Sequence, residues 1–289
     1  MAKNMQSLLT GFEMIRKAAV AGYFYPGSRE GIDRQIRGFP LGEFSREDVV
    51  GLLAPHAGYK YSGRVAAMVY ARAKVSGPVI YIGPNHGAGR GAAAPKIAMM
   101  AKGTWKYPGG MTQIDSRLAT LLLESSCQIA DAGWAHEEEH SLEVQIPMLE
   151  HFSPDTQIVP IIISRIDDGE VMELAECIYQ GIVKYGGPVT LAASTDMSHY
   201  VPQEMAEKLD RMAIERIEAL DAEGLLKTVR ANRISMCGAQ PTAVVVEVCR
   251  KLGAKQAHLV EYTTSGEVSG DYSSVVGYSG FTISRPGAE

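Results

Sequence analysis

The sequence predicts an α/β fold, in which a mainly parallel or mixed central sheet carries helices on both faces. Short apolar segments alternate with amphipathic segments of helical length along the chain, and this alternation favours parallel strand neighbours. Most of the apolar segments lack the in-and-out alternation of a half-exposed strand, which indicates burial on both faces. We therefore predict a single α/β domain over residues 14–289.

Six apolar segments have the length and composition of buried strands. They are 49–53, 79–82, 158–163, 190–193, 257–262 and 275–283. The helical pattern between them is clear in 62–73, where the apolar residues are Val65, Met68, Val69 and Ala73. The other predicted helices are 114–123, 141–149, 169–185, 203–220 and 239–252.

Composition limits the classes of protein that the chain can belong to. It has 28 Lys and Arg against 33 Asp and Glu, a net charge of −5, which argues against nucleic-acid and anionic-membrane binding. No apolar run approaches the roughly 20 residues that span a bilayer, and the start lacks the apolar core of a signal peptide. Residues 1–13 are expected to be an N-terminal extension, either disordered or the result of the choice of start site. We expect a cytoplasmic protein.

Three histidines follow the ends of predicted strands. His56 lies in APHAGY, His86 in GPNHG and His199 in STDMSHY, close to Asp196. Ligands of such sheets gather at the carboxyl ends of the strands. A single histidine there is usually a hydrogen-bonded loop residue, but three at one topological position favour a shared site that could hold iron, copper or zinc.

The chain has four cysteines, too few and too scattered for a disulfide framework. Cys237 comes directly before a predicted helix that has Pro241 in its first turn. A helix amino end lowers the pKa of a thiol, so Cys237 is either a reactive or metal-binding thiolate or a small buried residue. The remaining cysteines, Cys127, Cys177 and Cys249, are predicted to be buried apolar residues.

The segment HEEEH, from His136 to His140, matches the zinc-peptidase pattern H-E-x-x-H. That pattern needs an established helix, so that both imidazoles project from one face. Here a turn-like segment precedes it, and three consecutive acidic residues would crowd one helical turn. We therefore predict a loop leading into a helix at Ser141, with His140 able to line a cleft, and keep the peptidase as an alternative.

Taken in order, seven segments resemble the Memo family (mediator of cell motility), known in prokaryotes as AmmeMemoRadiSam system protein B. The resemblance runs from Met14 to about Ile283. It is carried by AVAGYFYP, APHAGYKYSG, GPNHG, EEEHSLEVQIPML, STDMSHY, CGAQP and SGDYSSVVGYSGF. Memo proteins are similar in fold to class III extradiol dioxygenases, the non-haem iron enzymes that open catechol rings.

The resemblance implies a metal site made by His56, His86 and Cys237, with iron(II) or copper as the metal and zinc as a further candidate. It places His199 at the position of the dioxygenase acid/base histidine, with Asp196 beside it. His140, which could line the same cleft, is a third catalytic candidate. The related dioxygenases have a carboxylate where this chain has Cys237. A thiolate is softer and itself oxidisable, which favours copper(I) or zinc and counts against ring cleavage.

Two functions follow as hypotheses. The first is a metal-dependent, dioxygenase-like oxidoreductase that acts on an unidentified small molecule. The second is a non-catalytic binding or scaffold protein that uses the same pocket for a peptide or a partner protein. The prokaryotic family name adds a radical-SAM protein and its small partner as expected binding partners.

Overall fold

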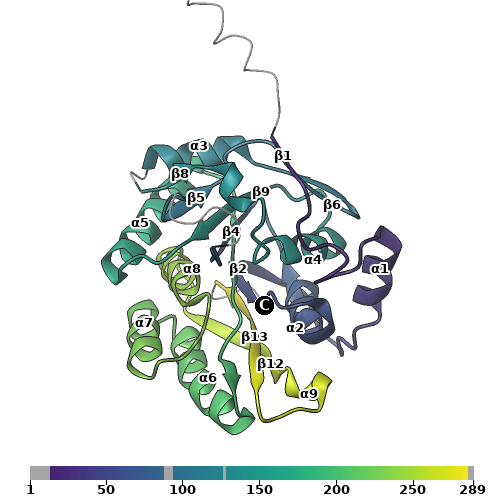
Figure 1. Cartoon of the computed structure of the whole chain (residues 1–289). Helices are drawn as coiled ribbons and strands as arrows, with labels where there is room; N and C mark the ends of the chain where they lie inside the picture. The colour runs from purple at the N-terminus through teal and green to yellow at the C-terminus, as the bar shows by residue number, and fades with distance from the viewer. Residues whose placement is uncertain (1–13, 88–93, 126–127, 286–289) are drawn as a thin grey trace, which may run out of the picture.

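A ten-stranded sheet forms the centre of the protein (Figure 1). The structure is a computed structural model, which describes residues 14–87, 94–125 and 128–285. The predicted extension 1–13 lies outside the described residues. The strands are ordered β11-β13-β2-β10-β4-β9-β5-β8, with β12 paired to β13 and β3 to β2. They are β2 (Glu47–Ala54), β3 (Ala73–Lys74), β4 (Val79–Pro84), β5 (Ile97–Met99), β8 (Ala130–Asp131), β9 (Ile158–Ile163), β10 (Thr190–Ser194), β11 (His199–Val201), β12 (Gln256–Thr264) and β13 (Val275–Ser284).

The centre of this sheet is parallel and antiparallel pairs adjoin it on both sides, which confirms the prediction of a mixed sheet. Strands β2, β10, β4 and β9 pair in parallel. Strand β13 runs antiparallel to β2, and β5 runs antiparallel to β9. Every residue of β4, β9 and β10 is buried, because helices cover both faces of a parallel sheet.

Helices flank the sheet on two sides (Figure 1). Helices α5, α7 and α8 lie on one side, while α1, α2 and α4 lie on the other. The helices are α1 (Arg29–Arg37), α2 (Tyr59–Arg72), α3 (Ser116–Ser125), α4 (Ile146–Phe152), α5 (Asp168–Tyr185), α6 (Gln203–Glu218), α7 (Ala222–Ala231), α8 (Ala239–Lys251) and α9 (Gly266–Ser269). A small second sheet contains β1 (Ile15–Arg16), β6 (Thr104–Tyr107) and β7 (Gly110–Gln113). None of the helices in the described part of the chain is long and apolar enough to cross a membrane.

The helix predicted over 141–149 begins later than expected. A 3-10 turn, Glu143–Gln145, precedes α4, which has Pro147 in its first turn. The backbone amide groups of His140 and Ser141 donate to the Glu139 carboxylate instead of entering a helix. That side chain therefore keeps residues 139–141 in a loop.

Two apolar cores lie on the two faces of the sheet. Helix α8 packs on the face of the first core, and its Cys249 is fully buried against β2. The prediction that Cys249 is a small buried residue is confirmed, whereas Cys127 lies outside the described residues. Gly51 of β2 faces this sulfur, and a Cβ at position 51 would lie 2.5 Å from the Cys249 Sγ.

We predict that Gly51→Ala lowers the free energy of unfolding by roughly 1–3 kcal/mol, because the added methyl group overpacks this contact. Replacing Cys249 by Ala in the same chain removes the clashing sulfur, so the two substitutions should be strongly non-additive. Urea denaturation of the two single variants and the double variant measures this coupling. Additive effects would show that the contact does not limit the packing of α8 on the sheet.

Candidate metal centre

The carboxyl ends of three neighbouring strands deliver the histidine and acidic residues to one edge of the sheet. Strand β2 leads to His56, β10 to Asp196 and β4 to His86. Because β10 lies between β2 and β4 and pairs in parallel with both, the three strands end together. The Asp196 Oδ1 accepts a hydrogen bond from the His56 backbone amide at 2.8 Å and so joins two of these loops.

Cys237 joins the same edge from the turn before α8. The Cys237 Sγ lies 3.3 Å from the His56 Nε2 and accepts a hydrogen bond from the Asp196 amide at 3.2 Å. The close approach of the Cys237 turn to the strand ends depends on Gly238, where a Cβ would lie 2.4 Å from the Ser194 carbonyl oxygen. A side chain at 238 would push this turn, and Cys237 with it, away from the strand ends.

His140 is the third histidine of the centre, although its loop is far from the other two in sequence. Its ring stacks on that of His86 with centroids 4.6 Å apart, and it meets the His56 ring edge-on at 5.6 Å. One ligand atom from each of His56, His86 and His140 lies within 4.8 Å of the others. Two nitrogen ligands of one ion lie at most about 4.2 Å apart, since metal–nitrogen bonds are about 2.1 Å long. The three imidazoles could therefore hold a metal ion after small side-chain movements.

Hydrogen-bond counting fixes the tautomer of His56. The Ser194 hydroxyl donates its one proton to the Ser141 carbonyl at 2.6 Å and accepts from the Gln145 amide at 3.0 Å. The His56 Nδ1, which is 3.0 Å from the same oxygen, must then be its second donor. The His56 Nε2 is left with a free lone pair that points towards Cys237, as a metal ligand requires.

A buried carboxylate fixes His86 in the same way. The Glu139 Oε1 accepts from the His86 Nδ1 at 2.9 Å, and Oε2 accepts from the His86 backbone amide at 2.6 Å. Carboxylates in this position orient metal-binding histidines and raise their basicity. Glu139 is 1% exposed, whereas Glu137 and Glu138 are on the surface. The pair leaves the His86 Nε2 free on a side chain that is 32% exposed, so the centre is open to solvent there.

Burial and Glu139 set the protonation of the three rings. Burial lowers the pKa of His56 to about 4 and lowers that of His140, so both are neutral at pH 7. Burial also opposes the charged form of His86, but the hydrogen bond and the charge of Glu139 outweigh it and raise the pKa. For Glu139, burial is outweighed by His86 and by backbone amides, which lower the pKa to about 2. The neutral rings of His56 and His140, together with the ionised Glu139 carboxylate, favour the binding of a cation.

The thiol of Cys237 differs from the sequence prediction. The helix amino end was expected to lower its pKa, but desolvation by burial, together with the charge of Asp196, raises it. Hydrogen bonds from the Asp196 backbone, the Thr195 side chain and the Gly238 backbone lower the pKa, but burial outweighs them. In the metal-free chain Cys237 is therefore a neutral thiol, and only a bound cation would favour the thiolate.

His199 lies beside the centre rather than in it. Its backbone amide donates to the Ser235 Oγ at 2.7 Å, and its Nδ1 donates to the Ser235 carbonyl at 2.9 Å. Among the described residues, no hydrogen bond, ion pair or ring contact joins His199 to the three clustered histidines. Asp196, which was expected to act beside His199, contacts His56 and Cys237 instead. Ser235 orients His199 and leaves its Nε2 free to take a proton.

The HEEEH segment does not form a zinc-peptidase helix. His136 ends a 3-10 turn, Gly133–His136, and its ring is fully buried against Trp105 with centroids 5.7 Å apart. His140 instead faces His56 and His86. The two imidazoles therefore do not share a helix face, and the peptidase alternative is wrong.

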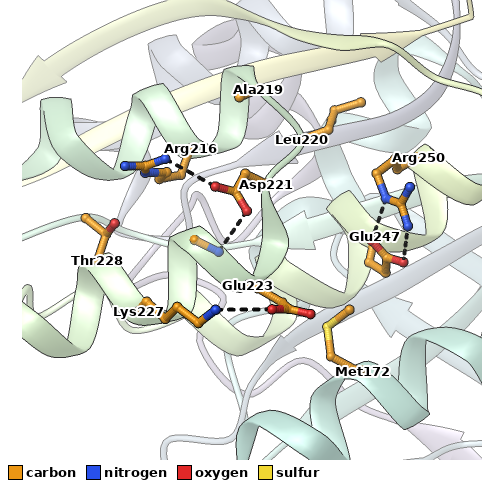
Figure 2. Close-up of a pocket in the computed structure, with 11 residues that line it drawn as sticks. Met172, Arg216, Ala219, Leu220, Asp221, Glu223, Lys227, Thr228, Glu247 and Arg250 are labelled. Carbon is orange, nitrogen blue, oxygen red and sulfur yellow. Dashed lines mark hydrogen bonds and ion pairs between the residues drawn. The ribbon is translucent and has the colours of Figure 1, made fainter.

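A separate hollow of about 660 Å³ lies on the surface between α6, α7 and α8 (Figure 2). Its charged side chains pair with one another: Arg216 with Asp221, Lys227 with Glu223, and Arg250 with Glu247. The charged side chains that line the hollow are therefore all paired. The histidine centre is the better candidate site.

Sequence reasoning missed Ser194 and Glu139, which set the tautomers of the two strand-end histidines. Ser194 is the last residue of β10, and only the position of a polar residue at a buried strand end could have indicated its role. Glu139 is one of three consecutive acidic residues, and nothing in the sequence distinguishes it from its exposed neighbours.

The comparisons with known proteins agree on one family. Residues 16–282 match the family described as Memo-like protein. A protein of Methanopyrus kandleri named as a MEMO1 family protein is 38% identical over 94% of this chain and 100% of its own length. Another, from Methanosarcina barkeri, is 37% identical over 93% of this chain and 100% of its own length.

One solved structure supports the fold alone. The crystal structure of an uncharacterized protein from Escherichia coli K12 superposes with a TM-score of 0.52 at 14% identity. It covers 79% of this chain and 98% of its own. At that identity the likeness extends to the arrangement of sheet and helices and not to the residues of the centre.

We predict that Glu139→Gln lowers the pKa of His86. The carboxylate raises that pKa against the effect of burial, so removing its charge leaves burial to favour the neutral ring. NMR titration of the metal-free protein, with the imidazole signals assigned, measures the change. The imidazole signals of His151, which lies near Asp33 and away from the centre, serve as the internal reference for correct folding of the variant. An unchanged or raised pKa of His86 would contradict the assigned hydrogen bond.

Proposed function

We propose that this chain, which belongs to the Memo family, is a metal-dependent oxidoreductase with dioxygenase-like chemistry. The observation that supports it most is the convergence of His56, His86 and His140 on one solvent-open point, with Cys237 next to His56. Iron(II) or copper suits a donor set of imidazoles and one thiolate, and zinc is the further candidate. A reducing cytoplasm, our proposed location, would keep this thiol available.

The donor set fits a cation on chemical grounds. The hydrogen bonds to Ser194 and Glu139 occupy the Nδ1 atoms of His56 and His86 and leave the His86 Nε2 for a ligand. The His56 Nε2 meets the Cys237 Sγ at 3.3 Å, so a cation would bind between these two atoms once the thiol proton is lost. His140 was expected to be catalytic, but its ring lies as close to the other two as a ligand would. We therefore propose that His56, His86 and Cys237 bind the metal and that His140 either completes this set or moves a proton beside it.

When bound, iron or copper would supply a redox-active Lewis acid at this point. The chain's own residues would admit the ligand, accept a proton and add negative charge beside the metal. The His86 side of the centre admits the ligand, since that side chain is the most exposed of the three. His199, held by Ser235, presents a free Nε2 that can accept a proton from an organic substrate. The Asp196 carboxylate, 3.9 Å from the His56 Nε2, adds negative charge that favours the cation.

The alternative proposal is a non-catalytic protein that binds a peptide or a partner protein over the same centre. Two exposed tyrosines favour it. Tyr23 is 90% exposed and precedes Phe24, which stacks on His140, while Tyr200 is 78% exposed and follows His199. Exposed aromatic rings next to a pocket suit a docking surface. Association with a radical-SAM protein and its small partner stays a prediction, which anaerobic co-purification tests.

We predict that the metal-loaded protein holds about one equivalent of iron or copper and that His56→Ala or Cys237→Ser abolishes this stoichiometric binding. Inductively coupled plasma mass spectrometry after anaerobic loading measures the content. The same measurement on His140→Ala decides the role of His140. A lower metal content would identify it as a ligand, and an unchanged content would leave it a proton-moving role. His258→Ala, at an exposed position of β12, and Cys177→Ser on α5 are matched controls that should bind as the unmodified chain does. Equal metal content in all variants would contradict the site.

We predict oxygen uptake by the metal-loaded protein with at least one member of a catechol panel, and roughly 10²–10⁴-fold slower uptake for His199→Ala. An oxygen electrode measures both rates. His199→Ala should keep its metal, because the proposed role of His199 is proton transfer. Absence of uptake across the panel, together with peptide binding that His56→Ala removes, would favour the binding protein over the enzyme.

A further inference from the structure

One buried arginine spans the loop that carries Glu139 and His140. Arg16, in β1, is 1% exposed. Its Nε donates to the His136 carbonyl at 3.0 Å, and its Nη2 donates to the Glu139 carbonyl at 2.6 Å. Its Nη1 donates to the Glu143 Oε2 at 2.5 Å. A single guanidinium thus fixes the loop at both ends and in the middle.

Glu143 completes this clamp from the other side. Its carboxylate also accepts from the backbone amides of Ala19 and Val20 and from the Tyr25 hydroxyl. The Arg16 guanidinium lies 4.5 Å from the centre of the Trp105 ring. A buried ion pair that is fully hydrogen-bonded is weak evidence for stability, because desolvation offsets the attraction. Its geometry, which orders residues 136–143, is the more informative property.

The clamp and the metal centre share Glu139. The carbonyl of Glu139 is held by Arg16, while its carboxylate accepts from the His86 amide, the His86 Nδ1 and the amides of His140 and Ser141. The backbone of one residue is therefore anchored on the side away from the centre, and its side chain is aimed into it. The same N-terminal segment also stacks Phe24 on His140 at 4.8 Å.

We propose that Arg16 is a positioning residue of the metal centre, which acts through the Glu139 backbone to hold His86 and His140 in ligand geometry. This inference rests on the proposed metal-binding function. A lysine at position 16 keeps the charge, but its three N–H donors diverge from one nitrogen and cannot reach the three oxygens that Nε, Nη1 and Nη2 of Arg16 contact. Arg16→Lys is therefore the variant that removes the geometry and keeps the ion pair.

Titration with Co²⁺, followed by its visible absorption, tests the proposal. Groups that orient metal ligands typically contribute 10–100-fold to affinity, so we expect Arg16→Lys and Glu143→Gln each to raise the Kd by about that factor. We also expect altered Co²⁺ absorption bands, since these report ligand geometry and a merely structural role would leave them unchanged. Ile178→Val, a core change in α5, is the stability control and should keep the unmodified Kd and spectrum.

Circular dichroism establishes which variants are folded, and Glu143→Gln carries the test if Arg16→Lys does not fold, because it leaves Arg16 in place. An unmodified Kd and spectrum in the folded variants would overturn the role of Arg16 and leave the metal centre intact. No Co²⁺ binding by the unmodified protein would overturn the proposed function instead, and this inference with it.

Discussion

The buried carboxylate of Glu139 is the constraint on which the arrangement of the centre depends. Two of its hydrogen bonds, from His86, join the loop after β4 to the loop before α4, about fifty residues away in sequence. Two more, from the amides of His140 and Ser141, hold its own loop. Removing such a carboxylate would leave several buried N–H groups without an acceptor, which costs about 1–3 kcal/mol each. The same bonds decide which nitrogen of His86 is free. Loop geometry and ligand chemistry are therefore set by one side chain.

In both strand-end histidines, a neighbouring side chain holds Nδ1 by a hydrogen bond, so that Nε2 faces the centre. Ser194 has its proton committed to the Ser141 carbonyl, so His56 must donate to it, while the Glu139 carboxylate can only accept from His86. Two different groups therefore leave the same nitrogen, Nε2, facing the centre in two histidines at one edge of the sheet. This agreement is what a binding centre requires and what a chance cluster of histidines would not show. It would hold whether an ion bound there served catalysis or recognition.

The fold was predictable because the apolar pattern of each segment indicates its own secondary structure and burial. Segments such as 158–163, apolar at every position, indicated strands buried on both faces, and the structure has β9 at these residues. The strand-end positions of His56 and His86 followed from the same pattern. The partners of these residues were not predictable, because Glu139, Ser194 and Arg16 act across large sequence separations and look ordinary in sequence. The pKa of Cys237 was predicted with the wrong sign, since the sequence displays the helix start but not the burial that outweighs it.

The most direct test of the centre is X-ray absorption fine structure on the protein loaded with one equivalent of iron or copper. We predict a first shell of imidazole nitrogens, identified by the multiple scattering of their rings, with one sulfur at about 2.3 Å, the usual length of a metal–thiolate bond. A shell of oxygen atoms alone, without imidazole scattering, would mean that the three histidines do not bind the ion and would contradict the centre described here.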